Sequence, residues 1–488
     1  METRVLAFDF GASSGRAMLA VFDGTVIRME EIHRFSNDPV MVGQTLHWDI
    51  LRLLHEVKRS ISIAAARGWV DCIGIDTWAV DFGLLDAKGR LMQNPVHYRD
   101  RRTDGMLEEL LTRIPKAELY GKTGIQFLQI NTICQLYALT KQDPELLERA
   151  HKLLMIPDLI GYFLTGKQHC EYTNASTTQL LDAISKQWNV SLMQKLGIPS
   201  RIFCDIVQPA SIYGRLSPEL CDELGVPPCD VIAVGSHDTA SAVAAVPATQ
   251  QDFVYISCGT WSLMGTELGA PLMDEKALGY NFTNEGGVNG TIRYLKNIMG
   301  LWLIQESRRA WQREGQEYSY AELEHLALCA QPFACFIDPD DPSFLAPGNI
   351  PERVRDYCRR TGQPVPQSVG EVMRCIYESL ALKYRVVLEQ LKDCTGKEYS
   401  KIHVVGGGTK DGLLCRMTAA ACNMQVLAGP KEATVLGNIV VQFMAMGRLT
   451  GLSQARAVIA QSEDTTLYLP EDSAAWETAY EAFKNILA

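Results

Sequence analysis

The chain has 488 residues and a formal net charge of -11, and no stretch gathers Lys and Arg into a block, so a nucleic-acid partner is not expected. Its length exceeds what a single hydrophobic core serves, which predicts two large domains. The 14 cysteines never form a CxxC pair and the nine histidines form no HExxH, so the sequence indicates neither a zinc motif nor a redox dithiol.

No apolar run approaches the roughly 20 residues that a membrane-spanning helix needs. The opening stretch METRVLAFDFGASSGR carries Asp9 inside its apolar part and lacks a signal-peptide layout. The cysteines are scattered along the chain, and reduced thiols of this kind are typical of cytoplasmic proteins. We therefore expect a cytoplasmic protein that acts on small molecules.

The first hundred residues predict one α/β unit. Short apolar runs at 5–10, 16–22 and 25–32 are separated by glycine-containing turns and predict a three-stranded meander. Asp49 is a candidate helix cap, and Gly68 marks the end of the helix that follows. Its apolar residues have helical spacing, and a strand at 72–78 comes next. In this arrangement the first hairpin turn faces the carboxyl edge of the sheet.

A similar beginning recurs in the second half, where 253–260 and 261–268 predict strand, glycine turn and strand. We therefore expect two copies of one unit, with a polar hinge at 246–252. Further on, Ser368 and Glu371 predict a capping box ahead of an amphipathic helix, and a strand at 401–405 follows it. The segment 331–366 is rich in Pro and Asp and predicts a surface loop insertion.

The turn from Gly11 to Arg16 consists mostly of small residues. Its backbone amides and the hydroxyls of Ser13 and Ser14 are able to approach a phosphate, and Asp9 beside them is a candidate for holding Mg²⁺ through water. A plain hairpin turn explains the same residues equally well.

Two further glycine turns lie in the second half. The stretch CGTWS offers Thr260 and neighbouring amides to a phosphate chain. The stretch VVGGGTKDGLL follows a strand and opens a helix, where an adenosine or its α-phosphate can rest on backbone groups. It is neither a Walker loop nor a GxGxxG fingerprint, and such a turn alone is more often a packing feature.

Polar residues near the expected strand ends are candidate sugar contacts. Asp76 and Asp81 flank Trp78, an aromatic plate with carboxylates beside it, although a strand pair with a buried Trp is the simpler interpretation. Further candidates are either ligand contacts or, equally, a solvated loop and satisfied polar residues of a helix face: Asp100, Arg101, Asn284, Asn297 and Gln305.

Asp238 starts an Ala/Val-rich helix in the stretch GSHDTASAV. One interpretation is an N-cap that satisfies the amides of the first helical turn. The other is a catalytic base, whose ionised form the amides at the helix start would favour. Both interpretations are compatible with this sequence.

Several blocks occur in one order and together resemble the FGGY family of sugar kinases. They are FDFGASSGR, GIDTWAVDF, YRDRRT, GSHDTASAV, SCGTWSLMG, TNEGG, LKNIMGLWL and VVGGG. The similarity runs from about Val5 to the region of Gly437, which is nearly the whole chain. HDTASAV and KNIMGLW are more specific than any single glycine-rich turn.

The resemblance implies an α/β fold of the actin-like ATPase (ribonuclease H-like) type, with two similar domains and an interdomain cleft. Residues 1–246 would form the sugar and phosphate-loop side, and 247–488 the adenosine side. It implies phosphoryl transfer from ATP with Mg²⁺, with L-rhamnulose as the expected sugar and its 1-hydroxyl as acceptor, in a monomer or homodimer. The alternatives are L-fuculose or another ketose or polyol, and, in a different class, an actin-like or chaperone-like ATPase without sugar transfer.

The resemblance also assigns roles. Asp238 is the expected general base and Asp9 the magnesium-associated acid. The expected ATP contacts are Ala12, Ser13, Ser14, Gly15, Arg16, Thr260, Gln305 and Gly407. The expected sugar contacts are Trp78, Ala79, Asp81, His237, Thr239 and Asn297.

Two positions depart from the family pattern. Ala79 stands where the family has Gly, so its methyl group would tighten or shift the sugar pocket. Cys258 stands where Ser is usual, with little expected consequence because the loop acts through amides and Thr260. Cysteine pairs of some relatives are not clearly reproduced, so we predict no structural disulfide.

Overall fold

The structure is a computed structural model that describes residues 2–250 and 252–487 and divides into two compact units. The first unit comprises Met1–Thr249, Glu267–Tyr294 and Ala433–Glu463, and the second comprises Gln250–Thr266, Leu295–Glu432 and Asp464–Ala488. The division into residues 1–246 and 247–488 stays a prediction. The expected hinge at 246–252 includes Gln251, which lies outside the described residues.

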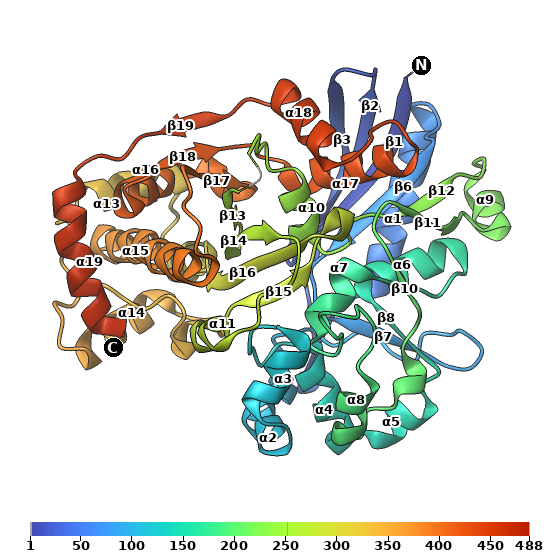
Figure 1. The fold of residues 1–488 in the computed structure, drawn as a ribbon, viewed down its shortest axis with the longest axis horizontal. Coiled ribbons are helices and arrows are strands. Elements are labelled where there is room, and N and C mark those ends of the chain that lie inside the picture. Colours follow the sequence, from blue (N-terminus) through green and yellow to red (C-terminus); the bar gives the residue numbers. More distant parts are fainter. Residues whose placement is uncertain (1, 251, 488) are drawn as a thin grey trace. The chain divides into compact units, whose positions relative to one another are not determined.

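The first unit is built on a six-stranded sheet in the order β11-β12-β6-β1-β2-β3 (Figure 1). β1 (Thr3–Phe10), β2 (Ser14–Phe22) and β3 (Ile27–Ser36) pair antiparallel, so the predicted meander is confirmed. β6 (Cys72–Thr77) lies parallel to β1, and β12 (Asp230–Ala233) lies parallel to β6. The carboxyl ends of three parallel strands therefore meet at one edge.

Helix α1 (Ile50–Ala66) begins as predicted, because Asp49 accepts a hydrogen bond from the Arg52 amide at 3.2 Å. Its apolar face joins the core formed by Leu6, Phe8 and Phe10 of β1. Gly68, just past the helix, adopts φ +110°, a conformation that glycine tolerates and larger residues resist.

The remaining elements of the first unit include β11 (Ser211–Arg215), which is the edge strand of this sheet, and β15 (Thr283–Gly286), which belongs to a separate seven-stranded sheet. The other strands are β4 (Val40–Val42), β5 (Thr45–His47), β7 (Phe82–Leu85), β8 (Lys152–Met155), β9 (Cys170–Glu171) and β10 (Ile206–Val207). The helices are α2 (Met106–Arg113), α3 (Lys116–Thr123), α4 (Thr132–Gln142), α5 (Pro144–Arg149), α6 (Ile156–Thr165), α7 (Tyr172–Ala175), α8 (Val190–Leu196), α9 (Pro218–Leu224), α10 (Asp238–Ala244), α11 (Glu275–Tyr280), α17 (Ala433–Ala445) and α18 (Leu452–Ser462).

The second unit repeats the strand pattern of the first. β13 (Val254–Cys258) pairs antiparallel with β14 (Trp261–Leu268) and parallel with β17 (Lys401–Val405). β18 (Gln425–Ala428) continues the parallel series, and β19 (Thr466–Tyr468) closes it antiparallel. The expected α/β class and the second copy of one unit are both confirmed.

Helix α15 (Val369–Thr395) starts with the predicted capping box of Ser368 and Glu371. It packs against α13 (Tyr320–Cys329) and α16 (Gly412–Cys422). β16 runs from Ile292 to Met299, and its last residues belong to the second unit. The other helices of this unit are α12 (Trp302–Arg313), α14 (Ile350–Arg360) and α19 (Ser473–Leu487).

The prediction of a surface loop at 331–366 holds only in part: 331–349 is mostly irregular, but part of the segment is helical and part is buried. The segment contains α14, and Ile337, Phe344 and Val354 are fully buried. Asn349 caps α14 and Pro351 occupies its first turn, so part of the polar and proline content marks the start of a helix.

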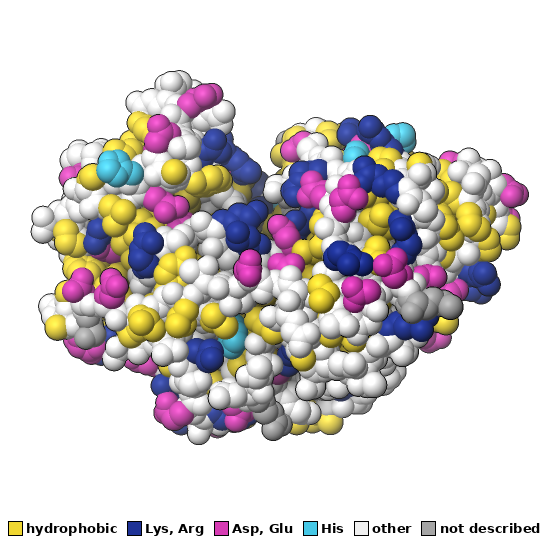
Figure 2. Space-filling view, turned by 90° about the horizontal axis from the view of Figure 1, so that it is seen from above, with side chains coloured by type: hydrophobic (Ala, Val, Ile, Leu, Met, Phe, Trp, Pro, Cys, Tyr) yellow, Lys and Arg dark blue, Asp and Glu magenta, His cyan; other side chains and the backbone are white. Residues whose placement is uncertain are grey.

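The face shown in Figure 2 intermixes acidic and basic side chains with hydrophobic ones. Among the described residues, no helix has both the length and the apolar character required to span a membrane.

Candidate functional site

Two carboxylates lie side by side at the carboxyl edge of the first sheet. The parallel register of β1 and β6 pairs Asp9 with Asp76. Asp76 is fully buried, its Oδ2 accepts a 2.7 Å hydrogen bond from the Asn438 amide group, and its Oδ1 has no partner. Burial, followed by the negative charges of Asp9 and Asp238, raises the pKa of Asp76.

Asp9 is held by Arg16 on the next strand. The guanidinium donates to Asp9 Oδ2 from Nε at 3.0 Å and from Nη2 at 2.7 Å. Carboxylate oxygens are the ligands that Mg²⁺ prefers, and the unpartnered, buried Asp76 Oδ1 lies among mutually repelling acids. These residues therefore fit a divalent cation, and Asp76 joins the predicted Asp9 as a candidate ligand.

The turn between β1 and β2 is held by hydrogen bonds to its backbone carbonyl groups. The Gly11 amide donates to the Ser14 carbonyl at 2.9 Å, and the Asn37 side chain donates to the Gly11 carbonyl at 2.9 Å. Ser13 is exposed and Ala12 is partly exposed, as a ligand-binding turn requires. Gly15 has a packing reason, because an added Cβ would lie 2.3 Å from the Phe35 ring.

Trp78 packs against Trp48, with ring centroids 4.1 Å apart. Both indole N–H groups donate to Asp81 Oδ2, Trp48 at 2.6 Å and Trp78 at 3.0 Å, and Gln135 donates to Oδ1 at 3.0 Å. Burial nevertheless raises the pKa of Asp81 to about 6. The Asp81 carboxylate thus anchors both rings. The sequence did not indicate that Trp48 is a partner of Trp78 and Asp81.

The backbone beside Ala79 is strained. Val80, a β-branched residue, adopts φ +66°, which is unusual for any residue except glycine. Its carbonyl accepts a 2.7 Å hydrogen bond from the Thr132 hydroxyl, which helps to hold the turn in place. Ala79 itself is partly exposed.

The turn before α10 lies beside the end of β6. The Thr77 amide donates to the Ser236 carbonyl at 2.9 Å, and Thr77 forms an isolated parallel bridge with His237. Glu171 accepts a 2.6 Å hydrogen bond from the Ser236 hydroxyl and a 2.6 Å bond from the Thr173 hydroxyl. Glu171 therefore fixes the turn that carries His237 and Asp238, and no sequence motif indicated it.

The interpretation of Asp238 as an N-cap is wrong. His237 occupies the cap position without a side-chain cap hydrogen bond, and Asp238 is the first helical residue. The Asp238 side chain is 30% exposed and accepts a 3.0 Å hydrogen bond from the Thr239 hydroxyl. Asp238 is therefore available to a ligand.

The expectation that the helix start keeps Asp238 ionised stays a prediction, and other influences on its pKa act in the opposite direction. Burial of its surroundings is the largest influence and raises the pKa of Asp238, with Asp9 adding to it and His237 opposing it. A carboxylate with a raised pKa is a stronger base, which suits proton abstraction.

His237 is held from behind by a buried ion pair. Arg293 is fully buried, donates to His237 Nδ1 at 3.0 Å, and lies 3.0 Å from Glu285 Oε2. On the other side, His237 Nε2 lies 3.4 Å from Asp238 Oδ1. Burial acts to raise the pKa of Glu285, but Arg293 and His237 together outweigh it and lower that pKa. The sequence missed Glu285 and Arg293.

The second unit brings together its own set of expected residues. Thr260 lies in the turn after β13, and its hydroxyl donates to Gln305 Oε1 at 3.5 Å. The amide of Trp302, at the start of α12, donates to the Thr260 carbonyl at 3.1 Å. Asn297 lies on β16, so the alternative of a helix-face position is wrong for this residue.

The third glycine turn, at 406–408, packs against Cys258 at the end of β13. Gly406 adopts φ +83°, and an added Cβ at Gly408 would lie 2.2 Å from Cys258 Sγ. An added Cβ at Gly407 would meet nothing within 4 Å. Close packing explains Gly406 and Gly408, whereas Gly407 faces open space, as a nucleotide contact requires.

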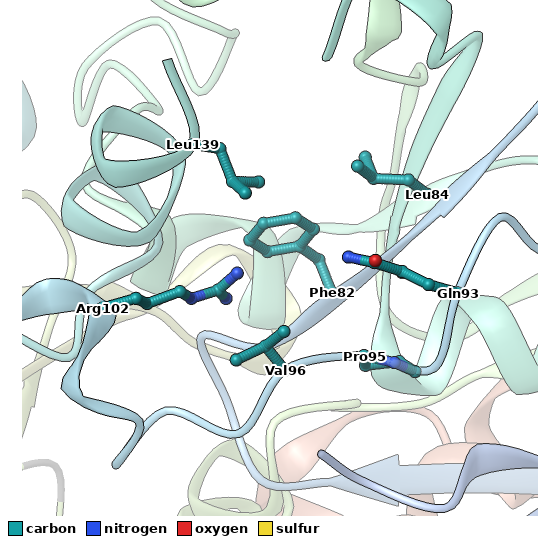
Figure 3. Close-up of a pocket in the computed structure, with 8 residues that line it drawn as sticks. Phe82, Leu84, Gln93, Pro95, Val96, Arg102 and Leu139 are labelled. Atoms are coloured by element: carbon teal, nitrogen blue, oxygen red, sulfur yellow. The ribbon is translucent and has the colours of Figure 1, made fainter. Parts of the chain in front are cut away.

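Other polar candidates have structural partners. Asp100 accepts a 2.8 Å hydrogen bond from the Leu46 amide, and the Asn284 side chain forms hydrogen bonds with the backbone of Leu272 and Gly124. Arg101, in contrast, is exposed. A small pocket in the first unit is lined by both polar and apolar side chains, and Figure 3 shows Arg102 and Phe82 among its walls. None of the expected ATP-binding or sugar-binding residues lines this pocket.

The comparisons with known proteins agree along the whole chain. Models of the FGGY family of carbohydrate kinases match residues 4–245 with the N-terminal domain and 254–446 with the C-terminal domain. A rhamnulokinase of Bacteroides thetaiotaomicron is 44% identical over 486 residues, covering 99% of both chains. A rhamnulokinase of Bacillus subtilis is 40% identical over 467 residues, covering 96% of this chain and 95% of the relative.

Solved structures share the fold at lower identity. A ligand-bound xylulose kinase of Lactobacillus acidophilus superimposes with a TM-score of 0.82 at 17% identity, covering 99% of this chain and 97% of that one. A Plasmodium falciparum glycerol kinase with ADP gives 0.78 at 16% identity, covering 99% and 97%. The expected actin-like ATPase type of α/β fold is confirmed, and the chain belongs to the FGGY family of carbohydrate kinases.

Proposed function

We propose that the protein transfers the γ-phosphoryl group of ATP to the 1-hydroxyl of L-rhamnulose and releases L-rhamnulose 1-phosphate and ADP. The observation that carries the reaction is the partly exposed Asp238 carboxylate with a raised pKa at the first residue of α10. The choice of sugar rests on the rhamnulokinases that are 40% to 44% identical over nearly their full length.

Asp238 accepts the proton of the 1-hydroxyl while that oxygen attacks the γ-phosphorus. The new O–P bond forms as the bond to the β,γ-bridging oxygen breaks, and that electron pair leaves with ADP. General-base assistance of this kind contributes about a hundred- to ten-thousand-fold in rate.

The side chains around Asp238 bind and orient the sugar. His237 and Thr239 flank the base, and Trp78, held by Asp81, offers an apolar ring face. In this proposal Asp81 acts through Trp78 because its oxygens already accept protein hydrogen bonds. Ala79 narrows the same region, and Asn297 contributes a further sugar contact.

The nucleotide contacts are backbone groups and small side chains. In the first unit these are the turn residues Ala12 to Arg16, and in the second unit Thr260, Gln305 and Gly407. Asp9 and Asp76 would hold Mg²⁺, which when bound neutralises phosphate charge. Residues 1–246 serve the sugar and phosphates, and 247–488 serve the adenosine. The proposal includes a cytoplasmic monomer or homodimer.

The test is a coupled ADP-release assay with Mg²⁺ and ATP against L-rhamnulose, L-fuculose, L-xylulose, D-xylulose and glycerol. We expect the highest kcat/KM for L-rhamnulose. A higher value for another sugar would overturn the substrate while leaving a sugar kinase. ADP release that ignores the sugar would overturn sugar transfer and favour an actin-like or chaperone-like ATPase.

A further inference from the structure

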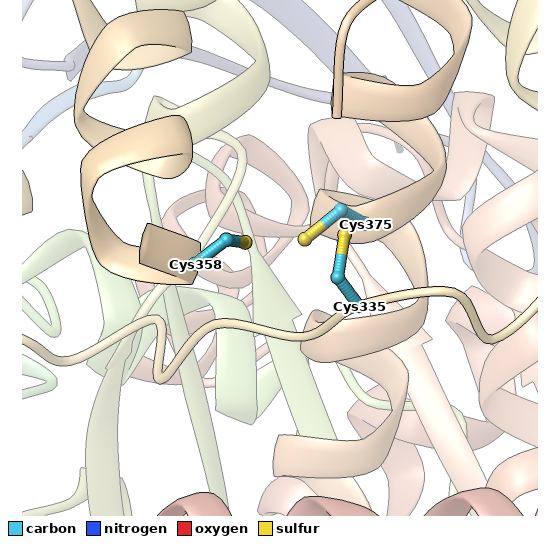
Figure 4. A group of neighbouring side chains, drawn as sticks. All are labelled: Cys335, Cys358 and Cys375. Atoms are coloured by element: carbon cyan, nitrogen blue, oxygen red, sulfur yellow. The ribbon is translucent and has the colours of Figure 1, made fainter. Parts of the chain in front are cut away.

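Three cysteines that lie far apart in the sequence meet inside the second unit. Cys335 lies on the segment after α13, Cys358 on α14 and Cys375 on α15, and Figure 4 shows their side chains converging. Their Sγ atoms lie within 4.8 Å of one another, and each residue is at most 5% exposed.

The three segments are held independently of the thiols. The Ile337 amide donates to the Ser379 hydroxyl on α15 at 2.9 Å, and the Phe336 amide donates to Gln363 Oε1, just past α14, at 2.8 Å. The cluster is thus preorganised by backbone contacts that do not involve the sulfur atoms.

The geometry matches a sulfur-bound metal ion. A metal–sulfur bond of about 2.3 Å places the three sulfur atoms of a trigonal site about 4 Å apart. This spacing is compatible with the separations in the cluster, and only three potential ligands lie in the group among the described residues. Structural Zn²⁺ sites are almost always four-coordinate, whereas Cu(I) is stable with three thiolates.

We propose that Cys335, Cys358 and Cys375 bind one thiophilic d¹⁰ metal ion through three thiolates, with Cu(I) favoured over Zn²⁺. The ion cross-links α14, α15 and the segment before them. Since binding to the folded state alone stabilises it, the bound ion raises the temperature of unfolding. This site is independent of the kinase reaction.

The test titrates Cu(I), buffered by a competing chelator under anaerobic conditions, into the reduced full-length protein. We expect the wild type to hold one Cu(I) per chain more than Cys358→Ser and to show a Cu(I)-dependent rise in Tm that the variant lacks. X-ray absorption is expected to report three sulfur neighbours. Cys335→Ser, on a non-helical segment, provides a second variant in case Cys358→Ser fails to fold.

Cys422→Ser is the matched control, because Cys422 lies in the same unit and outside the cluster. It must retain both the extra Cu(I) and the rise in Tm. Equal Cu(I) content in all variants would overturn the site. Mass spectrometry that finds a disulfide among the three cysteines after anaerobic isolation would also overturn it. A parallel Zn²⁺ titration that fills the three-cysteine site while Cu(I) does not would overturn the choice of ion.

Discussion

The two units share one strand pattern but place different chemistry at the same position. In the first unit the penultimate residue of the central strand is Asp9, paired in register with Asp76. In the second unit it is Ser257, paired with Val405. The first unit therefore concentrates carboxylates where its parallel strands end, and the second presents a hydroxyl and an apolar side chain.

The turns that follow differ in the same way. After the first turn, Arg16 donates a hydrogen bond to Asp9. Before the second turn, Cys258 lies close to the backbone of Gly406 and Gly408. The duplicated fold thus supplies two similar edges, and the side chains decide their chemistry. We expect changes in the first unit to affect proton transfer and charge balance, and changes in the second to affect packing and nucleotide affinity.

The largest expected effect is that of Asp238→Asn in the first unit. Loss of the base should lower kcat about a hundred- to ten-thousand-fold while the KM for ATP stays nearly constant. Steady-state kinetics with the preferred sugar measure both. Asp222→Asn, an exposed residue of α9, is the control and should match the wild type. A variant that keeps more than about a tenth of wild-type turnover would contradict the base assignment.

The next effect concerns the ion pair behind His237. Arg293→Met leaves Glu285 buried without its cation, and we expect the free energy of unfolding to fall by about 3–5 kcal/mol. Urea denaturation measures this loss. In contrast, Arg28→Met removes an exposed pair with Glu2 and should cost less than about 1 kcal/mol. If the free energy of unfolding falls by a similar amount in both variants, burial does not set the contribution of the ion pair to stability.

The second unit is tested by two adjacent glycines. Gly408→Ala forces a Cβ against Cys258 Sγ and should destabilise by about 1–3 kcal/mol. Gly407→Ala meets open space, so its stability should stay near the wild type while the KM for ATP rises. Thermal unfolding and ATP kinetics separate the two effects. The nucleotide assignment of Gly407 fails if its variant binds ATP like the wild type.

The smallest effect is a shift in pH dependence. Asp238 must be ionised to accept a proton, so its raised pKa predicts that kcat/KM falls with decreasing pH at a midpoint above the ordinary 3.8. Thr239→Val removes a hydrogen bond that lowers this pKa, and should move the acid limb upward by about one pH unit or less. Circular dichroism over the same range must show folded protein. A downward shift would contradict this account.

Local signals in the sequence predicted much of the fold. Helix caps and turns act through neighbouring backbone groups, so nearby residues in the sequence predict them. Examples are the cap at Asp49, the capping box of Ser368 and the glycine turns. Composition was a poorer guide at 331–366, where Pro342 and Pro351 lie at the starts of helices within a segment that we predicted to be a loop.

The parts of the candidate site that the sequence missed depend on distant residues. Asn438 on α17 bonds to Asp76, Trp48 bonds to Asp81, and Arg293 bonds to His237. Each partner is an ordinary polar or aromatic residue in its own neighbourhood, so no local pattern distinguishes it. An Arg within an apolar strand, as in IRYLKN, is a signal that could have indicated a hidden acidic partner, but our predictions did not include one.

By itself, the sequence determined the α/β class, the repeated unit, the family and most candidate site residues, because caps, turns and motif order are local or linear properties. Only the tertiary structure decided that Asp9 and Asp76 pair, that Asp238 is not a cap, and that three distant cysteines converge. Parallel strand register and helix packing join residues far apart in the chain, and those contacts set burial, charge coupling and pKa.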